Sequence, residues 1–410
     1  MLQLPDHSPL LDLHTARESA LAQVTATEAV RDLALSAAMG QVAARDVLAL
    51  QAMPFFTNAA MDGYALRVTG RVAGPLRLPI CGTVAAGEAA PTALDTDTAR
   101  RIFTGAALPE GADAVVAIED TREEAGVLLL DTLPKPGNHL RRVGSDQPAG
   151  ACLLARGTRI APHHVGLLAA NGISRVTVTR QPRVAVLSTG DELAGARRGP
   201  GQIHDANRPM LLALAEAAGA VAIDAGTLPD DVEAVAQKLQ DLSRNADLVL
   251  SSGGVSMGGR DPLRPAFLAA GGEIGAWRVA VKPGKPVMFG RIGRTAFTGL
   301  PGNPFAAFVG FQLFAAAQIA KLSGRTPAAF AAAQGLANFS WQRRPDRAEV
   351  FPVRCTGTDS SGLPRLERLG NGVSATLYPL AAADGLAIVP ASTATVAPGD
   401  RLAWHPFCAG

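Results

Sequence analysis

Residues 247–261, with the sequence DLVLSSGGVSMGGRD, join a short apolar run to a glycine-rich turn that ends in an acid. Such a run is too short for a typical helix and has the aliphatic composition of a buried strand. A similar run, RVAVLST at 183–189, leads into Gly-Asp-Glu, and a third, AVAIDAGTL at 220–228, leads into Pro-Asp-Asp. Helical patterns follow at 210–219, 231–246 and 261–272. Strands that alternate with helices predict a parallel sheet with helices on both faces.

Shorter patterns on either side of this α/β region divide the chain into four parts. Apolar residues recur every three or four positions over 15–50, including a long stretch at 26–47, and a helix with a first-turn proline is expected at 162–172. Residues 54–143 instead contain brief β-branched stretches between glycines and prolines, and the same texture returns after Pro327. We therefore predict a discontinuous helical domain (1–50 plus 144–180), an inserted mostly-β domain (51–143), the α/β domain (181–327) and a C-terminal β domain (328–410).

Composition excludes several classes of protein. The chain has 38 Lys plus Arg and 36 Asp plus Glu, and a formal net charge of +2 gives no field that would attract nucleic acid or a membrane. Glutamines and a glycine interrupt the apolar run Phe305–Ala320, so we expect a buried helix there. The N-terminus has no secretory signal pattern. The cysteines, Cys81, Cys152, Cys355 and Cys408, lack metal-binding spacing and indicate reduced, mostly buried thiols in a cytoplasmic protein.

Candidate binding residues gather where the predicted strands end. Ligands of an open parallel sheet bind at that edge, because loops and helix N-termini converge there. Acids follow the three strands, with Asp191 and Glu192 after the first, Asp230 and Asp231 after the second, and Asp261 after the third. Carboxylate oxygens suit Mg²⁺, and glycine-rich backbone suits an oxyanion. The turns KPGKP (282–286) and LPGNP (300–304) add two lysines and an asparagine, so this edge suits a phosphate or another tetrahedral anion.

Each of these signals also has a purely structural interpretation. A glycine-rich loop after a strand is often a plain turn, acids at 230–231 suit a helix start, and isolated lysines suit a solvated surface. The loop is neither a P-loop nor a GxGxxG fingerprint, which disfavours a nicotinamide enzyme. His163, His164 and His204 lack the partners of a metal site or a catalytic triad, and we assign them to structure. Asp62, which precedes a glycine, is by itself a turn residue.

Six motifs occur in a characteristic order: MDGYA (61–65), FTGAALPEGADAVV (103–116), LSTGDEL (187–193), SSGGVSMGGRD (251–261), VKPGKP (281–286) and LPGNP (300–304). The ordered set resembles the molybdopterin molybdenumtransferase family, of the MoeA and gephyrin E-domain type. This resemblance implies a multidomain α/β plus β protein, with a three-layer α/β domain of molybdopterin-binding type and a parallel-rich sheet. It also implies a helical segment, an inserted mostly-β module and a C-terminal β module.

The resemblance further implies a reaction, in which adenylylated molybdopterin and molybdate give molybdenum cofactor, AMP and water. Phosphoanhydride cleavage needs negative charge to be neutralised, and oxide leaving molybdate needs protons. Mg²⁺ is the implied cofactor, with Asp231, Asp261 and Glu192 as ligands. The expected catalytic residues are Asp62, Thr104, Glu192, Asp231, Lys282 and Lys285, and the expected substrate-binding residues are Asp191, Ser252, Gly253, Gly254, Ser256, Pro301, Gly302, Asn303 and Arg347.

The resemblance implies an elongated homodimer, with the site between the α/β domain of one subunit and the inserted module of the other. Three positions depart from the family pattern. Arg260 stands where many relatives carry an acid, ATLYPL (375–380) stands where relatives often have serines, and Arg347 matches a family arginine only loosely.

Two other functions share part of this pattern. A molybdopterin adenylyltransferase would have the α/β domain but usually lacks the MDGYA module. A scaffold or molybdopterin carrier would not need the acids and lysines. The adenylyltransferase is also a candidate partner.

Overall fold

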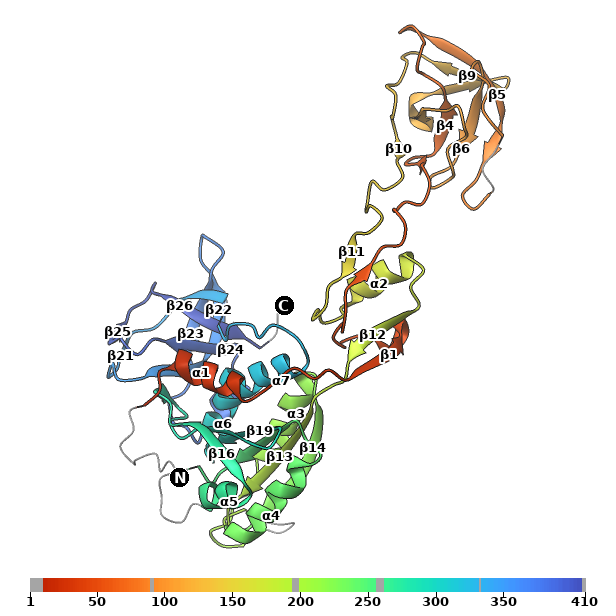
Figure 1. The fold of residues 1–410 in the computed structure, drawn as a ribbon. Helices are drawn as coiled ribbons and strands as arrows, with labels where there is room; N and C mark the ends of the chain where they lie inside the picture. The colour runs from red at the N-terminus through yellow and green to blue at the C-terminus, as the bar shows by residue number, and fades with distance from the viewer. Residues whose placement is uncertain (1–9, 89–91, 194–198, 256–261, 332, 408–410) are drawn as a thin grey trace.

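The computed structural model describes residues 10–88, 92–193, 199–255, 262–331 and 333–407. The molecule is elongated (Figure 1). The α/β domain and the C-terminal β domain lie together at one end, and the inserted β domain lies at the other end. Between them runs a narrow stalk, which we define as residues 30–50 and 144–180. The stalk has its own small apolar core, which includes Leu154, Leu168 and Val178.

The predicted parallel sheet is present in the α/β domain. Its strand order is β14-β13-β15-β19-β18-β16. The four parallel strands are β13 (Arg183–Thr189), β14 (Val221–Leu228), β15 (Leu248–Ser252) and β19 (Thr295–Leu300), and β18 (Met288–Ile292) and β16 (Gly272–Trp277) extend the sheet in antiparallel fashion.

Successive residues of β13 face the two helical layers in turn. Val184 and Val186 lie in one apolar cluster, and Ala185 and Leu187 lie in another. The first cluster includes residues of α1 (Leu13–Ala22), α3 (Asn207–Ala217), α6 (Pro304–Gly310) and α7 (Ala316–Leu322), and the second includes residues of α4 (Val232–Ser243) and α5 (Leu263–Ala269). Side chains of a strand point alternately to the two faces of the sheet, so a continuous aliphatic strand covers both layers. The expectation of helices on both faces is confirmed.

The apolar helix of the first layer is buried, as the sequence predicts. It runs from α6 through a π-helical segment, Phe311–Ala315, into α7. By length and composition it could cross a membrane, but 78% of its apolar window is buried inside the protein. Its buried Gln318 is fully engaged, because Nε2 donates to Ala20 O (3.0 Å) and Oε1 accepts from Thr298 Oγ1 (2.7 Å). This amide ties α1, α7 and β19 together.

The helical prediction for residues 26–47 is wrong. After α1 the chain forms β1 (Val30–Ala34), a short 3-10 turn and β2 (Val47–Leu48). These strands pair with β12 (Arg175–Thr179) and β11 (Cys152–Leu154) on the returning chain, so long-range strand pairing overrides the helical preference of the alanines. The predicted stalk helix is present as α2 (Pro162–Ala170), followed by Gly172 at φ +73°.

Two β domains complete the molecule. The inserted domain has a six-stranded sheet, and the C-terminal domain closes a five-stranded barrel through pairing of its first and last strands. The inserted sheet has the order β7 (Ala114–Ala117), β4 (Gly63–Leu66), β6 (Ala99–Ile102), β5 (Leu76–Val84), β9 (Val127–Leu130) and β8 (Arg122–Glu124). The barrel has the order β22 (Ala348–Thr358), β23 (Pro364–Arg368), β20 (Ala333–Ala337), β26 (Arg401–Pro406) and β24 (Gly385–Val389). One short strand, β17 (Val281–Lys282), joins β22 from outside the barrel.

The cysteine prediction is wrong in one respect. Cys81 and Cys152 are exposed and Cys355 is partly exposed, so these three free thiols are not core residues. They occupy strands of the inserted domain, the stalk and the barrel, where alternate positions face solvent. Cys408 lies outside the described residues.

We predict that Gly63→Ala unfolds the inserted domain while the rest of the chain stays folded. A Cβ at this position would lie 1.8 Å from the backbone oxygen of Val116 on the paired strand β7. Backbone cannot move aside as a flexible side chain can, so the expected cost is about 4 kcal/mol or more. Hydrogen exchange of β4 and β7 would measure it. The control is Gly166→Ala in α2, where a Cβ would meet nothing within 4 Å. Equal protection of β4 in both variants would contradict the prediction.

A polar cleft at the carboxyl ends of the parallel strands

A cleft of about 460 Å³ opens where β13 and β15 end. It is formed by the loops after these strands, the start of α3, the turn before α6 and one residue of the C-terminal domain, Ala375. Of the residues predicted from the sequence, it brings together Glu192, Ser252, Gly253, Pro301, Gly302 and Asn303. Six other predicted residues do not line it: Asp191, Asp231, Gly254, Lys282, Lys285 and Arg347. Ser256 and Asp261 lie outside the described residues.

Two glycine turns touch at the floor of the cleft. Gly253 and Gly254 both have positive φ, at +87° and +70°, which glycine adopts without strain. A Cβ on Gly253 would lie 2.6 Å from Thr189 O, and a Cβ on Gly302 would lie 3.5 Å from the Cα of Gly253. The amide of Gly253 donates to Leu300 O (3.2 Å), so it is used inside the fold rather than offered to an anion.

Asn207, which the sequence reasoning missed, holds these two turns together. Its Nδ2 donates to Ser252 Oγ and to Gly302 O, each at 2.7 Å, and the residue is 6% exposed. Because Ser252 Oγ accepts this bond, the hydroxyl hydrogen of Ser252 is left to point elsewhere. Asn207 is the first residue of α3, and an asparagine at a helix start is usually interpreted as a cap.

Further polar atoms are buried beside Asn207. The hydroxyls of Ser188 and Thr189 and Oδ1 of Asn207 have no hydrogen-bond partner within the part of the chain that the structure describes. Buried polar groups are nearly always paired, and a catalytic role or a bound water or ion is among the explanations for unpaired ones. His204, which we assign to structure from the sequence, and Asp205 also line the cleft. His164 does have a structural role, because its Nδ1 accepts from Ala161 N (3.0 Å) at the start of α2.

Three further acids lie close in sequence or space to Glu192, which lines the cleft, although they do not line it themselves. The amide of Asp230 donates to Asp191 Oδ1 (3.1 Å). Desolvation, followed by the negative charges of Asp191 and Glu192, raises the pKa of Asp230 above its ordinary value. Asp231, in contrast, caps α4, where its Oδ1 accepts from Ala234 N (2.7 Å). Among the described residues, no three His, Cys, Asp or Glu side chains are close enough together to hold a metal ion by themselves.

The lysine turn is bound to the C-terminal barrel. Lys282 lies on β17, and its Nζ is 3.0 Å from Oε1 of Glu349 on β22. Glu349 is 4% exposed, and its Oε2 is 3.3 Å from Nε of Arg343. Arg343 also donates to the carbonyl oxygen of Arg347. The predicted residues Lys282 and Arg347 are thus joined through Glu349 and Arg343. The main chain of Lys285 closes the turn by accepting from Val279 N (2.9 Å) and Val287 N (3.1 Å).

The C-terminal domain also reaches the cleft directly. Asn303 Nδ2 donates to Ser374 Oγ (2.8 Å), and Phe305 N donates to Ser374 O (3.1 Å). Ser374 stands immediately before ATLYPL, so a serine hydroxyl is present at this point despite the departure from the family pattern.

Asp62 and Thr104 form a separate pair in the inserted domain. The amide and the hydroxyl of Thr104 both donate to Asp62 Oδ1, each at 2.7 Å, and these bonds hold the pKa of Asp62 below its ordinary value. Met61, Phe103 and Ile118 beside the pair are exposed. Within one chain the inserted domain lies far from the α/β domain (Figure 1), so Asp62 and Thr104 do not join the cleft.

The fold and the cleft define a multidomain protein built around an α/β domain of molybdopterin-binding type. Three family models match: residues 11–172 match the MoeA N-terminal region (domain I and II), 185–321 a probable molybdopterin binding domain, and 334–407 the MoeA C-terminal region (domain IV). The chain belongs to the MoeA family of molybdopterin molybdenumtransferases. The family resemblance and the fold class that we predict from the sequence are therefore confirmed.

Relatives resemble the chain over most of its length. A Haemophilus influenzae protein named molybdopterin molybdenumtransferase is 39% identical over 77% of this chain and 78% of its own length. Molybdopterin molybdenumtransferase 2 of Mycobacterium tuberculosis is 36% identical over 90% of this chain and 93% of its own. The crystal structure of a molybdopterin biosynthesis MoeA protein from Pyrococcus horikoshii superposes with a TM-score of 0.83 at 26% identity, and covers 97% of this chain and 99% of that chain.

We predict that Asn207→Ala loosens the cleft floor and lowers the free energy of unfolding of the α/β domain by about 1–3 kcal/mol, because it removes one buried and one partly buried hydrogen bond. Urea denaturation and hydrogen exchange of the amide of Gly253 would measure the two effects. Gln237→Ala, which removes an exposed side-chain bond of 3.2 Å to Asp241, is the control and should change stability by less than about 0.5 kcal/mol. Unchanged exchange at Gly253 would contradict the prediction.

We predict that Thr104→Val raises the pKa of Asp62 toward its ordinary value, because one of the two bonds to the carboxylate is lost. In the unaltered protein the hydrogen bonds between Thr104 and Asp62 contribute their full stability at pH values above the ordinary pKa of an aspartate. This stability is lost as the pH falls through the lowered pKa of Asp62. Carboxyl-carbon NMR titration would follow Asp62 in both proteins. Identical titration curves would refute the proposed cause.

Proposed function

We propose that the protein inserts molybdenum into molybdopterin: adenylylated molybdopterin and molybdate give molybdenum cofactor, AMP and water. Family membership over nearly the whole chain carries this proposal, since relatives of matching length are named molybdopterin molybdenumtransferases. The cleft supports it with hydroxyls, a polar amide and an acid beside two glycine turns. An adenylyltransferase is not favoured, because the match extends through the N-terminal and C-terminal regions of MoeA as well as the α/β domain.

Positive charge and donors would stabilise the anions. The phosphoanhydride and molybdate both carry negative charge that must be neutralised as the reaction proceeds. Lys282 and Lys285 are proposed to supply ammonium groups from the turn that precedes Pro286 at the cleft edge. Glu349 already compensates part of the charge of Lys282, which makes Lys285 the stronger candidate. The hydroxyl hydrogen of Ser252 is a further donor, because Asn207 occupies its acceptor side.

Mg²⁺ is proposed at the acidic side of the cleft. Desolvation, and after it the negative charges of Asp191 and Glu192, raise the pKa of Asp230, and a bound cation would relieve the repulsion among these three acids. The described acids fit only part of a coordination shell, and Mg²⁺ commonly completes its shell with substrate phosphate oxygens and water. When bound, the ion would neutralise charge on the phosphate. Asp231 and Asp261, the other predicted ligands, remain proposals.

Proton delivery falls to a carboxyl group of the site. Each oxide that leaves molybdate as water takes up two protons, and one water is consumed when the phosphoanhydride is cleaved. Glu192 lines the cleft and is the proposed donor in the α/β domain. Asp62 is the alternative from the inserted domain, where its low pKa favours the ionised form and thus binding rather than donation.

A homodimer would bring the two halves of the site together. Asp62 and Thr104 lie on the inserted domain, and the cleft lies at the opposite end of the same chain. Exposed Met61, Phe103 and Ile118 around the pair offer an apolar contact surface. A second copy arranged by two-fold symmetry would place each pair at the cleft of its partner. The cytoplasm is the proposed location, and the molybdopterin adenylyltransferase is the proposed source of substrate.

The proposed function predicts molybdate-dependent AMP release from adenylylated molybdopterin in the presence of Mg²⁺. Lys285→Ala should abolish it without unfolding the protein. Asp231→Ala should also abolish it, but this change removes a helix cap worth about 1 kcal/mol as well as a charge. Asp231→Asn keeps a capping oxygen and removes only the charge, so full activity of Asp231→Asn would show that the reaction does not need the negative charge of Asp231. Pyrophosphate release from ATP and molybdopterin would instead indicate the adenylyltransferase.

The inter-subunit site predicts complementation between two inactive variants. Chains with Asp62→Ala lack the inserted-domain half, and chains with Lys285→Ala lack the cleft half. In a mixed dimer, one of the two sites combines two intact halves. Equimolar mixing should therefore restore about a quarter of the unaltered activity, given random assortment of symmetric dimers. A site built within one chain would show no restoration.

A further inference from the structure

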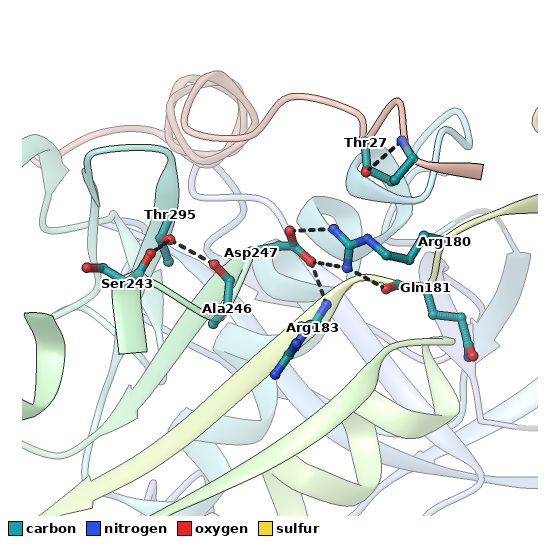
Figure 2. A network of polar contacts seen from close by, with 9 residues as sticks. Thr27, Arg180, Gln181, Arg183, Ser243, Ala246, Asp247 and Thr295 are labelled. Carbon is teal, nitrogen blue, oxygen red and sulfur yellow. Dashed lines mark hydrogen bonds and ion pairs between the residues drawn. The ribbon is translucent and has the colours of Figure 1, made fainter. Parts of the chain in front are cut away.

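The stalk is fastened to the α/β domain by an ion pair at the junction of the two (Figure 2). Arg180 directly follows β12 of the stalk, and Asp247 directly precedes β15 of the α/β sheet. Nη2 of Arg180 is 2.8 Å from Oδ1 of Asp247, and Nη1 is 3.0 Å from Oδ2. Oδ2 also accepts from the amide of Arg183 at 2.7 Å, where β13 begins. A single carboxylate therefore binds the last residue of the stalk and the first strand of the domain.

Both partners are held in place by other bonds. The amide of Arg180 donates to Ala29 O (2.8 Å), which joins the outgoing and returning chains of the stalk. The amide of Asp247 donates to Arg183 O (2.8 Å). Thr295 Oγ1 donates to the carbonyl of Ala246 (2.8 Å), the residue before Asp247 (Figure 2). Each side chain of the pair is 24% exposed, so this bidentate pair is better shielded than an ordinary surface pair.

Other contacts at this junction include two single, neutral hydrogen bonds and a like-charge repulsion between Arg159 of the stalk and Arg325 of the α/β domain. Thr27 N donates to Leu322 O (2.9 Å), and Gln181 Nε2 donates to Gly219 O (3.2 Å). The backbones of Gly157 and Gly324 also approach closely, since a Cβ on Gly157 would lie 2.8 Å from Gly324 O. Among the ion pairs between described residues, Arg180–Asp247 is the one that joins the stalk to the α/β domain. Its two charge-assisted hydrogen bonds make this pair stronger than the single neutral hydrogen bonds of Thr27 and Gln181.

We propose that the Arg180–Asp247 pair sets the direction of the stalk, so that Asp62 and Thr104 arrive at the cleft of a partner subunit. This inference rests on the proposed inter-subunit site. The inserted domain stands at the far end of the stalk, so a small rotation at the junction becomes a large displacement of Asp62 (Figure 1). Neither Arg180 nor Asp247 lines the cleft, and both act as positioning residues.

Distance measurement between spin labels tests the direction of the stalk without any activity. The labels occupy Cys81 of the inserted domain and Cys355 of the barrel, with Cys152→Ser and Cys408→Ser to remove the other thiols. Dilution with an excess of unlabelled cysteine-free chain restricts the signal to pairs within one chain. We expect a narrow distribution in the otherwise unaltered protein and a broader or shifted one in Arg180→Ala.

The matched control is Arg291→Ala, because Arg291 also contacts a carboxylate through two nitrogens, at 3.0 and 2.7 Å, but Glu273 lies within the same sheet. It should leave the distribution unchanged. An Arg180→Ala distribution identical to that of the control would overturn the proposal.

Activity in mixed dimers separates positioning from general destabilisation. One chain carries Lys285→Ala and supplies only the inserted domain, and the other carries Asp62→Ala and supplies only the cleft. Arg180→Ala in the first chain should lower AMP release between about 10- and 100-fold, as expected for a displaced catalytic group. In the second chain it should have no effect. Equal loss in both chains would overturn the positioning role. If the unaltered protein releases no AMP, the proposed function fails, and the distance measurement alone decides the inference.

Discussion

The cleft depends on direct contact between two backbone turns. A Cβ on Gly302 would lie 3.5 Å from the Cα of Gly253, and a Cβ on Gly253 would overlap the carbonyl oxygen of Thr189. Glycine at position 253 lets the ends of β13 and β15 come this close together, whereas a Cβ on Gly302 would make only an ordinary van der Waals contact. Asn207 reaches the same junction and binds one residue from each turn. The strand ends and the start of α3 are therefore fixed relative to one another. The polar groups that these segments carry into the cleft are held in fixed positions as a result.

The charge of the site is divided between domains. The turn that carries Lys282 is hydrogen-bonded to β22 of the barrel, and the buried Glu349 compensates the ammonium group. Ser374 from the same domain binds Asn303 at the start of α6. The C-terminal barrel is thus part of the wall of the site. In the proposed dimer, the inserted domain contributes Asp62 and Thr104 to the site of a second chain.

The elements that the sequence predicted well are those with an unambiguous local pattern. β13 begins and ends at the predicted residues, because a continuous aliphatic run between a proline and a glycine fits a buried strand and little else. For residues 26–47 the alanines at helical spacing predict a helix, but the same pattern also occurs in a strand. The partner of that strand, β12, lies far along the chain. Ser252, Gly253 and Asn303 were found through ordered motifs. Asn207 was not, because its contacts depend on loops that only the folded chain brings together.

The buried Gln318 has a consequence for how the chain is made. Its bond to Ala20 joins residues separated by 298 positions, so α1 emerges from the ribosome long before the surface that covers it. The stalk and the inserted domain have their own apolar clusters, so they can fold before the segments that pack on α1 are synthesised. During that time the face of α1 that carries Ala16 and Ala20 stays uncovered. Its alanines offer little apolar area to a chaperone or to another nascent chain, which suits a helix that stays uncovered until α7 has been made.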